Sequence, residues 1–213
     1  MSVAPGRFIT FEGGEGCGKS TQIRLLAERL RAAGREVLLT REPGGTALAE
    51  KIRSLVREES DDPPNSRAET LLFLASRAQV VENVIRPALA AGTWVLCDRF
   101  ADSTFAYQGY GRGLDLASLK GLNSFATGGL VPDRTVLLEV SPEVSAKRMR
   151  AREAATNTDA DRMEKAGDDF HSRLKQGFLE LAAMEPERFA VILADGSVEE
   201  VEEAVWNSIQ PML

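Results

Sequence analysis

The sequence has 213 residues, of which 43% are hydrophobic and 27% charged, and its net charge is −6. This length predicts one α/β domain over residues 1–213, and the acidic balance argues against a nucleic-acid binder. No apolar run is long enough to cross a membrane, so no membrane partner is expected. Two cysteines make no disulfide framework, so we expect reduced thiols in a cytoplasmic protein.

The first motif is a glycine-rich turn between an apolar strand, Phe8–Phe11, and a helix, Gln22–Ala33. Residues Gly13–Ser20 fit the phosphate-loop pattern G-x-x-x-x-G-K-[ST], in which glycines let backbone N–H groups point at phosphate oxygens. Lys19 can reach the β- and γ-phosphates, and the Ser20 hydroxyl can bind Mg²⁺. The predicted ATP-binding residues are Gly13, Gly14, Glu15, Gly16, Cys17, Gly18, Lys19, Ser20 and Thr21.

Strands and helices alternate along the rest of the chain. A buried strand is predicted over Val37–Thr40, and a long helix over Ala68–Ala91 is expected to bend at Pro87. Between them, the helix Thr46–Glu59 has four apolar residues on one face: Leu48, Ile52, Leu55 and Val56. The later predictions are strand Trp94–Asp98, a segment 99–113 with little regular pattern beyond a short helix, helix Leu116–Ala126, strand Thr135–Val140, a helix from Ser141 to about Arg152, helix Asp168–Met184, strand Val191–Leu193 and helix Val198–Ile209.

Continuous apolar strands that alternate with helices are typical of a parallel sheet covered on both faces. We therefore predict a five-stranded parallel sheet of this kind, with ligands at the carboxyl ends of the strands. Asp98 ends an apolar strand there and is predicted to hold Mg²⁺ opposite Ser20, although it can instead cap a turn. Arg99 can hold a second phosphate with its guanidinium, or form a surface ion pair.

Four cations gather in Lys147–Arg152, at the end of a predicted helix that follows the fourth strand. Such cations interact favourably with a helix C-terminus, which is the simpler explanation. On the ligand-binding edge, however, they predict a mobile basic lid over about residues 148–164 that closes on a triphosphate and excludes water. No residue has the setting of an activated nucleophile, which phosphoryl transfer does not require from the protein.

Four stretches together resemble bacterial thymidylate kinases: Phe11–Thr21, Thr40–Thr46, Leu96–Phe100 and Ala106–Gly109. The resemblance extends in order from the first strand to the last helix. It implies a P-loop kinase fold, and the transfer of a phosphoryl group from MgATP to dTMP, giving dTDP for dTTP synthesis. It also implies a homodimer through helices on one face, for which the long helix from Ala68 is the candidate.

The same resemblance assigns roles to single residues. Phe73 would stack on thymine, Arg77 would contact the base, and Tyr107 would pack near the sugar 2′ position and disfavour ribose. Glu15 would lie near the 3′-hydroxyl, and Arg99 would hold the dTMP phosphate. The predicted substrate-binding residues are Arg41, Arg53, Phe73, Arg77, Arg99, Thr104, Tyr107 and Gln108. The predicted catalytic residues are Lys19, Arg152, Arg148, Arg99 and Glu15.

The phosphate loop has no arginine, since position 16 is glycine, so the chain resembles relatives whose catalytic arginine lies in the lid. Whether Arg150 or Arg152 approaches the transferring phosphate stays open, and Asp161–Glu164 matches an element that recurs after the lid. Two other functions also stay open: another small-molecule or nucleoside monophosphate kinase of this fold, and a nucleotide-dependent switch or partitioning ATPase. The sequence lacks the N-K-x-D element that switch GTPases use to read their base.

Overall fold

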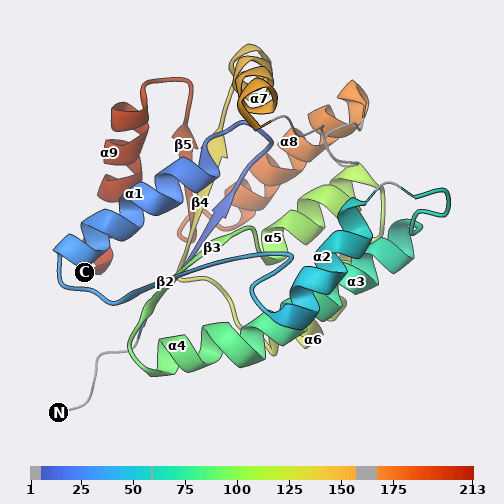
Figure 1. The fold of residues 1–213 in the computed structure, drawn as a ribbon, viewed down its shortest axis with the longest axis horizontal. Coiled ribbons are helices and arrows are strands. Elements are labelled where there is room, and N and C mark those ends of the chain that lie inside the picture. The colour runs from blue at the N-terminus through green and yellow to red at the C-terminus, as the bar shows by residue number, and fades with distance from the viewer. Residues whose placement is uncertain (1–5, 59, 157–166) are drawn as a thin grey trace.

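The computed structural model describes residues 6–58, 60–156 and 167–213 (Figure 1). Its strands form one parallel sheet in the order β2-β3-β1-β4-β5, which confirms the predicted five-stranded parallel sheet. The strands are β1 Phe8–Glu12, β2 Val37–Arg41, β3 Trp94–Asp98, β4 Arg134–Glu139 and β5 Phe189–Leu193.

Helices cover both faces of the sheet (Figure 1). The helices α1 (Lys19–Ala32) and α9 (Val198–Ile209) pack together on one face, where Phe11, Leu96 and Leu138 join their buried residues. The opposite face carries two further clusters, contributed by α3 (Ser66–Val80), η1 (Val81–Ile85), α5 (Ala101–Thr104), η2 (Phe105–Gly111) and α8 (Asp168–Met184). The remaining helices are α2 (Ala47–Arg57), α4 (Arg86–Ala90), α6 (Leu116–Thr127), α7 (Pro142–Thr156) and η3 (Gln210–Met212).

The long helix predicted over Ala68–Ala91 is continuous, but it widens into the π-helical turn η1 just before Pro87. Proline has no N–H to return to the carbonyl four residues earlier, so a wider turn at this point accommodates the missing hydrogen bond. The structure therefore differs from a simple bend at the proline, because the distortion lies over Val81–Ile85.

Residues 101–111 are helical, so the helix in the segment 99–113 is longer than the short one that the sequence allowed. The glycines that lower helix propensity in this segment are required by packing. A Cβ at Gly109 would lie 2.4 Å from Leu116 Cδ2, and one at Gly111 would lie 2.5 Å from the Phe170 ring. Close contact between helices therefore overrides the local propensity.

Both edge strands are less buried than predicted. On β2 the side chain of Leu39 is 42% exposed, and on β5 that of Leu193 is 75% exposed, because an edge strand has a neighbour on one side only. Of the four apolar residues predicted on one face of α2, two are buried and two are exposed. Ile52 and Val56 are buried against α3, whereas Leu48 and Leu55 are exposed by 51% and 59%. Among the described residues, no helix combines the length and apolarity that a membrane span requires.

Candidate active site

A cavity of about 590 Å³ opens at the carboxyl ends of the strands, where the sequence predicted a ligand site. It brings together these predicted residues: Glu15, Gly16, Cys17, Gly18, Lys19, Ser20, Thr21, Arg41, Arg53, Phe73, Arg77, Asp98, Arg99, Thr104, Tyr107, Gln108, Arg148 and Arg152. Gly13 and Gly14 lie in the same loop but do not line the cavity. We call Glu15–Thr21 with Asp98 and Arg99 the loop end, and Phe73, Arg77, Thr104 and Gln108 the helix end.

The tight path of the loop requires glycine at two positions. Gly13 has a φ of 132°, and a Cβ there would lie 2.4 Å from the Leu138 carbonyl oxygen. Gly16 has a φ of 67°, and a Cβ there would lie 2.8 Å from the Ser145 carbonyl oxygen on α7. Any other residue would therefore strain the backbone and collide with main-chain atoms. The curled loop surrounds the Lys19 ammonium, which donates to the carbonyl oxygens of Gly13 at 3.1 Å and Gly14 at 2.9 Å.

Ser20 and Asp98 meet at the loop end, as the prediction of a metal site requires. The Ser20 hydroxyl donates to Asp98 Oδ2 at 3.4 Å, across the gap between α1 and β3. The other carboxylate oxygen, Asp98 Oδ1, is buried and has no hydrogen-bond partner among the described residues. Two hard oxygen donors with spare acceptor capacity fit Mg²⁺.

An unusual backbone conformation directs the Arg99 side chain back toward the glycine-rich loop that contains Gly13 and Glu15. Its φ of 68° lies in the left-handed region, which costs free energy for a residue other than glycine and often marks a functional site. The guanidinium donates to Glu15 Oε1 at 2.5 Å and to the Gly13 carbonyl oxygen at 3.1 Å. It also lies over the Tyr107 ring, 4.8 Å from its centre. The loop end therefore holds two cations, Lys19 and Arg99, and two carboxylates, Glu15 and Asp98, of which Glu15 pairs with Arg99.

The electrostatics of Glu15 follow from these neighbours. Burial alone would raise the pKa of Glu15, but the opposing charges of Arg99, Lys19 and Arg152 lower it to about 2. Burial raises the pKa of Tyr107 well above its ordinary value, so its hydroxyl remains protonated and donates to Glu15 Oε1 at 3.3 Å. Glu15 is thus an ionised acceptor that keeps Arg99 and Tyr107 in place.

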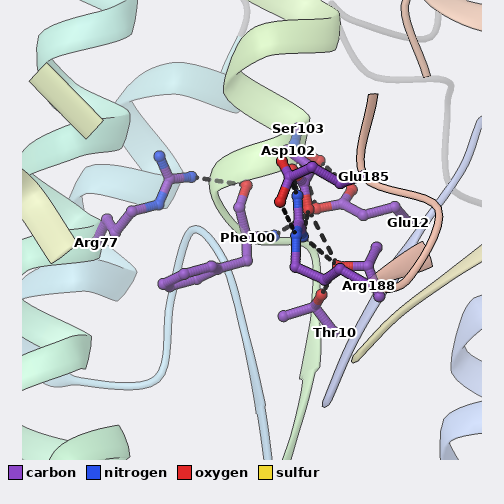
Figure 2. A network of polar contacts seen from close by, with 9 residues as sticks. Thr10, Glu12, Arg77, Phe100, Asp102, Ser103, Glu185 and Arg188 are labelled. Carbon is purple, nitrogen blue, oxygen red and sulfur yellow. Dashed lines mark hydrogen bonds and ion pairs between the residues drawn. The ribbon is translucent and has the colours of Figure 1, made fainter. Parts of the chain in front are cut away.

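Glu12, at the end of β1, is buried beneath the loop and was not predicted as a site residue (Figure 2). Its carboxylate accepts from the backbone N–H groups of Phe100 at 2.8 Å and Ser103 at 3.2 Å, and from the Ser103 hydroxyl at 2.6 Å. Burial and the nearby Asp102 carboxylate raise the pKa of Glu12 to about 7, against the opposing effect of Arg99. Glu12 therefore supplies the cap that α5 lacks from its own residues and fixes the turn that carries Arg99.

Asp102 connects this turn to β4 and to the segment directly before β5 (Figure 2). Its two oxygens accept from the Arg188 guanidinium at 2.7 and 2.9 Å, and the Thr135 hydroxyl lies 3.1 Å from Oδ2. Thr135 in turn pairs with the Thr10 hydroxyl at 2.9 Å. Buried polar groups from β1, β4 and the segment before β5 are thus satisfied together beneath the site.

At the helix end, Arg77 is buried in a dense polar network. Its Nε donates to Glu42 Oε2 at 2.7 Å, and its Nη1 to the Thr104 hydroxyl at 2.7 Å and to Asn123 Oδ1 at 2.6 Å. Its Nη2 donates to the Phe100 carbonyl oxygen at 3.0 Å (Figure 2). These bonds use four of the five N–H groups of the guanidinium. Arg77 is therefore held rigidly where it lines the cavity.

A family model described as thymidylate kinase matches residues 11–205. The chain belongs to the thymidylate kinase family. Among curated relatives, a thymidylate kinase from a Synechococcus species is 52% identical over 206 residues, covering 97% of this chain and 95% of that protein. One from Solidesulfovibrio magneticus is 50% identical over 208 residues, covering 97% and 100%. The crystal structure of thymidylate kinase from Ehrlichia chaffeensis matches with a TM-score of 0.78 at 34% identity, covering 97% of this chain and 100% of that one.

Membership confirms the predicted family and the reaction that defines it, phosphorylation of dTMP to dTDP. Of the three functions that the residues left open, it favours the first. The fold agrees as well, because the solved thymidylate kinase covers nearly the whole of this chain.

The basic segment of this thymidylate kinase family member lies on α7, which continues to Thr156, four residues beyond the predicted end. Arg148 and Arg152 line the cavity, and Arg148 Nη1 lies 3.5 Å from the Gly16 carbonyl oxygen. Arg150 is exposed and does not line the cavity, because residues four apart share a face of a helix and residues two apart do not. The rest of the predicted lid, including Asp161–Glu164, lies outside the described residues.

Two predicted arginines mark the rim beside α2. The Arg41 side chain is 53% exposed and pairs with both Glu50 oxygens at 3.1 Å, whereas Arg53 donates to the Pro43 carbonyl oxygen at 3.0 Å. Both line the cavity, as predicted.

Sequence reasoning missed several polar residues in and around the site, among them Glu12, Glu42, Glu69 and Ser103. Glu12 and Glu42 lie inside the motifs Phe11–Thr21 and Thr40–Thr46. Each could have been recognised as a charged residue directly after an apolar strand. Glu69 could have been found as a carboxylate one helical turn before Phe73, on the side of α3 that faces the cavity. Ser103 carries no such signal, because its role depends on Glu12.

Proposed function

We propose that this chain transfers the γ-phosphoryl group of MgATP to dTMP, giving dTDP for dTTP synthesis, and that its whole length acts as one catalytic domain. One observation carries the proposal: a single cavity joins a loop end suited to a triphosphate with a helix end suited to a flat base. Two nucleotides can therefore lie end to end, with their phosphates meeting at Lys19 and Arg99.

In the proposed reaction, an oxygen of the dTMP phosphate attacks the γ-phosphorus of ATP. The bond from that phosphorus to the β–γ bridging oxygen breaks, and ADP leaves. The attacking oxygen is already ionised at neutral pH, so the protein needs no general base and acts through position and charge. Lys19 would bind the β- and γ-phosphates, Arg99 the dTMP phosphate, and Arg148 and Arg152 would offset charge on the transferring group.

Ser20 and Asp98 are the residues that would hold Mg²⁺, directly or through water. The ion would neutralise charge on the β- and γ-phosphate oxygens of ATP. The buried Asp98 Oδ1, which lacks a described partner, supports this role. The Ser20 hydroxyl would turn from Asp98 and offer its oxygen to the same ion.

At the helix end, Phe73 would stack on thymine while Arg77 and Gln108 meet its polar edge, with Arg53 and Thr104 nearby. Tyr107 packs against Glu15 and Arg99, where a sugar would join base to phosphate, and would disfavour a 2′-hydroxyl. Arg41 would contact dTMP, the phosphate acceptor, from the rim of the cavity.

Both cysteines are free and buried, which supports a reducing compartment, and we propose the cytoplasm.

We also propose a homodimer. Helix α3 packs against both α2 and α6 (Figure 1). These three helices carry exposed apolar side chains: Leu48 and Leu55 on α2, Leu71 on α3, and Leu122 and Phe125 on α6. Phe125 is 88% exposed and Leu71 56% exposed, and monomeric proteins seldom leave so broad an apolar patch uncovered. The predicted candidate, the long helix, would contribute through Leu71 on α3.

The proposed function is tested by ADP release with MgATP and one acceptor at a time: dTMP, dUMP, dCMP, dGMP, UMP and thymidine. We expect strong turnover with dTMP, weak turnover with dUMP, and negligible turnover with the others. In the same assay, Arg99→Ala should raise the KM for dTMP roughly 100-fold and that for ATP much less, because it removes a charged hydrogen bond to the acceptor phosphate alone. Equal losses for both nucleotides would contradict this role of Arg99.

A further inference from the structure

The amide of Gln108 is held by a buried carboxylate on a neighbouring helix. Gln108 on η2 is 2% exposed, Glu69 on α3 is 1% exposed, and Gln108 Nε2 lies 3.1 Å from Glu69 Oε1. The other Glu69 oxygen lies 3.4 Å from Arg112 Nη2, so both carboxylate oxygens face hydrogen-bond donors. Glu69 does not line the cavity, whereas Gln108 does.

This contact decides which way the Gln108 amide points. An ionised carboxylate can only accept hydrogen bonds, so the amide nitrogen must face Glu69 and the amide oxygen must face away from it. Within the described part of the chain, no group donates a hydrogen bond to Gln108 Oε1. The side chain therefore offers a hydrogen-bond acceptor to the cavity.

Arg77, which also lines the cavity, offers a hydrogen-bond donor, because a guanidinium can only donate hydrogen bonds. Acceptor and donor together complement a pyrimidine that presents an N3–H donor beside a C4 carbonyl acceptor. Cytosine presents the reverse pair, an N3 acceptor beside an amino donor. Its N3 would meet the Gln108 oxygen, also an acceptor, and its amino group would meet Arg77, also a donor. If the Gln108 amide turned over, its NH₂ group would instead suit the N3 acceptor of cytosine.

We propose that Glu69 is a positioning residue for specificity: it fixes the orientation of the Gln108 amide, so that the site accepts a 4-keto pyrimidine and rejects a 4-amino one. The inference rests on the proposed function. Glu69 acts through Gln108 and contacts no substrate. Arg112 contributes by pairing with the second Glu69 oxygen, which holds the carboxylate in place.

The test is Glu69→Gln, compared in kcat/KM with dTMP and with 5-methyl-dCMP, which differs from dTMP only at the 4-position and N3. An amide at position 69 can accept or donate, so the Gln108 amide is released to adopt either orientation. We expect the ratio of dTMP to 5-methyl-dCMP to fall at least tenfold, while the KM for ATP stays within twofold. Glu82→Gln makes the same change on the same helical run at an exposed carboxylate and should leave the ratio unchanged.

A double-mutant cycle shows whether the effect passes through Gln108. In a Gln108→Ala background, Glu69→Gln should no longer change the ratio. An unchanged ratio in the single variant, or an equal change in both backgrounds, would overturn the proposal. If wild-type protein does not phosphorylate dTMP, the proposed function fails; if it does and the ratio is unmoved, only this inference fails.

The wild-type protein allows a second measurement if Glu69→Gln does not fold. The Gln108 NH₂ signals can be assigned in ¹H–¹⁵N spectra by their loss in Gln108→Ala. With dTMP bound, nuclear Overhauser effects should connect these protons to the Glu69 side chain and not to the ligand. Contacts to the ligand would show the opposite orientation and overturn the proposal.

Discussion

At the loop end of the cavity, the binding groups come from one short stretch of chain and the residues that follow β3. At the helix end they come from α3, α5 and η2, and the partners of Arg77, one of them on α6, lie between 23 and 46 residues from it in sequence. The loop end uses backbone geometry, glycines and charges that face the cavity, whereas the helix end uses buried side chains that hold each other. Function at the loop end should therefore be separable from stability, and at the helix end it should not.

The largest expected effect is at the loop end. Lys19→Ala should lower kcat roughly 10³-fold, because it removes a cation from the position where the transferring phosphate develops charge. Among the described residues, the hydrogen bonds of the ammonium go to loop carbonyls and the Cys17 sulfur, so the free energy of unfolding should change by less than about 1 kcal/mol. Coupled ADP release and urea unfolding measure the two quantities.

Lys147→Ala, which removes an exposed lysine from α7, is the matched control and should change neither quantity. A large loss of stability in Lys19→Ala would show that the loop end, like the helix end, couples binding to folding.

The opposite result is expected for Arg77→Met. The substitution keeps most of the volume but leaves the buried Glu42 without its counter-ion and Asn123 and Thr104 without their donor. Breaking a buried pair in this way costs about 3–5 kcal/mol of unfolding free energy. The KM for dTMP should rise as well, so stability and acceptor binding fall together.

Arg24→Met, on the exposed face of α1, controls for loss of an arginine and should leave both quantities unchanged. An Arg77→Met protein of wild-type stability would remove the distinction between the two ends.

The same contrast explains what the sequence could and could not predict. The strand–loop–helix pattern places Lys19, Ser20 and the glycines by local rules, and Asp98 and Arg99 follow from where a buried strand ends. Phe73 and Arg77 share a helix face, but their surroundings depend on which helices pack on α3. Sequence position singles out Glu12, Glu42 and Glu69 as candidates, but their partners are set by tertiary packing and do not follow from local rules. The full length of the helix over 101–111 depends on packing in the same way.

Two carboxylates, Glu15 in the loop and Glu12 beneath it, allow a test of their contributions to stability through pH. Because the pKa of Glu12 is raised to about 7 in the folded state, the native protein binds more protons than the unfolded chain between pH 4.5 and 7. Stability should therefore fall as pH rises through this range, by up to about 3 kcal/mol for a shift of this size. Glu12→Gln keeps acceptor and donor groups for Phe100 and Ser103, so it should flatten the profile measured by urea unfolding between pH 5 and 8.

Glu15→Gln is the matched control. The pKa of Glu15 is lowered to about 2, so its contribution to stability is fully present above pH 4.5 and is lost only as pH falls toward 2. Between pH 5 and 8 the Glu15→Gln profile should therefore run parallel to the wild-type profile. A Glu12→Gln profile with the wild-type slope would mean that another group is responsible.

The smallest expected effect concerns the proposed dimer, which would support the helix end from outside. Phe125→Glu places a charge on the exposed apolar face and should convert a dimer into a monomer in sedimentation velocity. Because α3 carries Leu71 on that face and Phe73 and Arg77 toward the cavity, the monomer should show a KM for dTMP that is roughly two- to fivefold higher. The KM for ATP should not change, since the loop end lies apart from these helices. Leu193→Glu, at an equally exposed leucine on β5, should leave the oligomeric state intact, and a wild-type protein that sediments as a monomer would rule out the dimer.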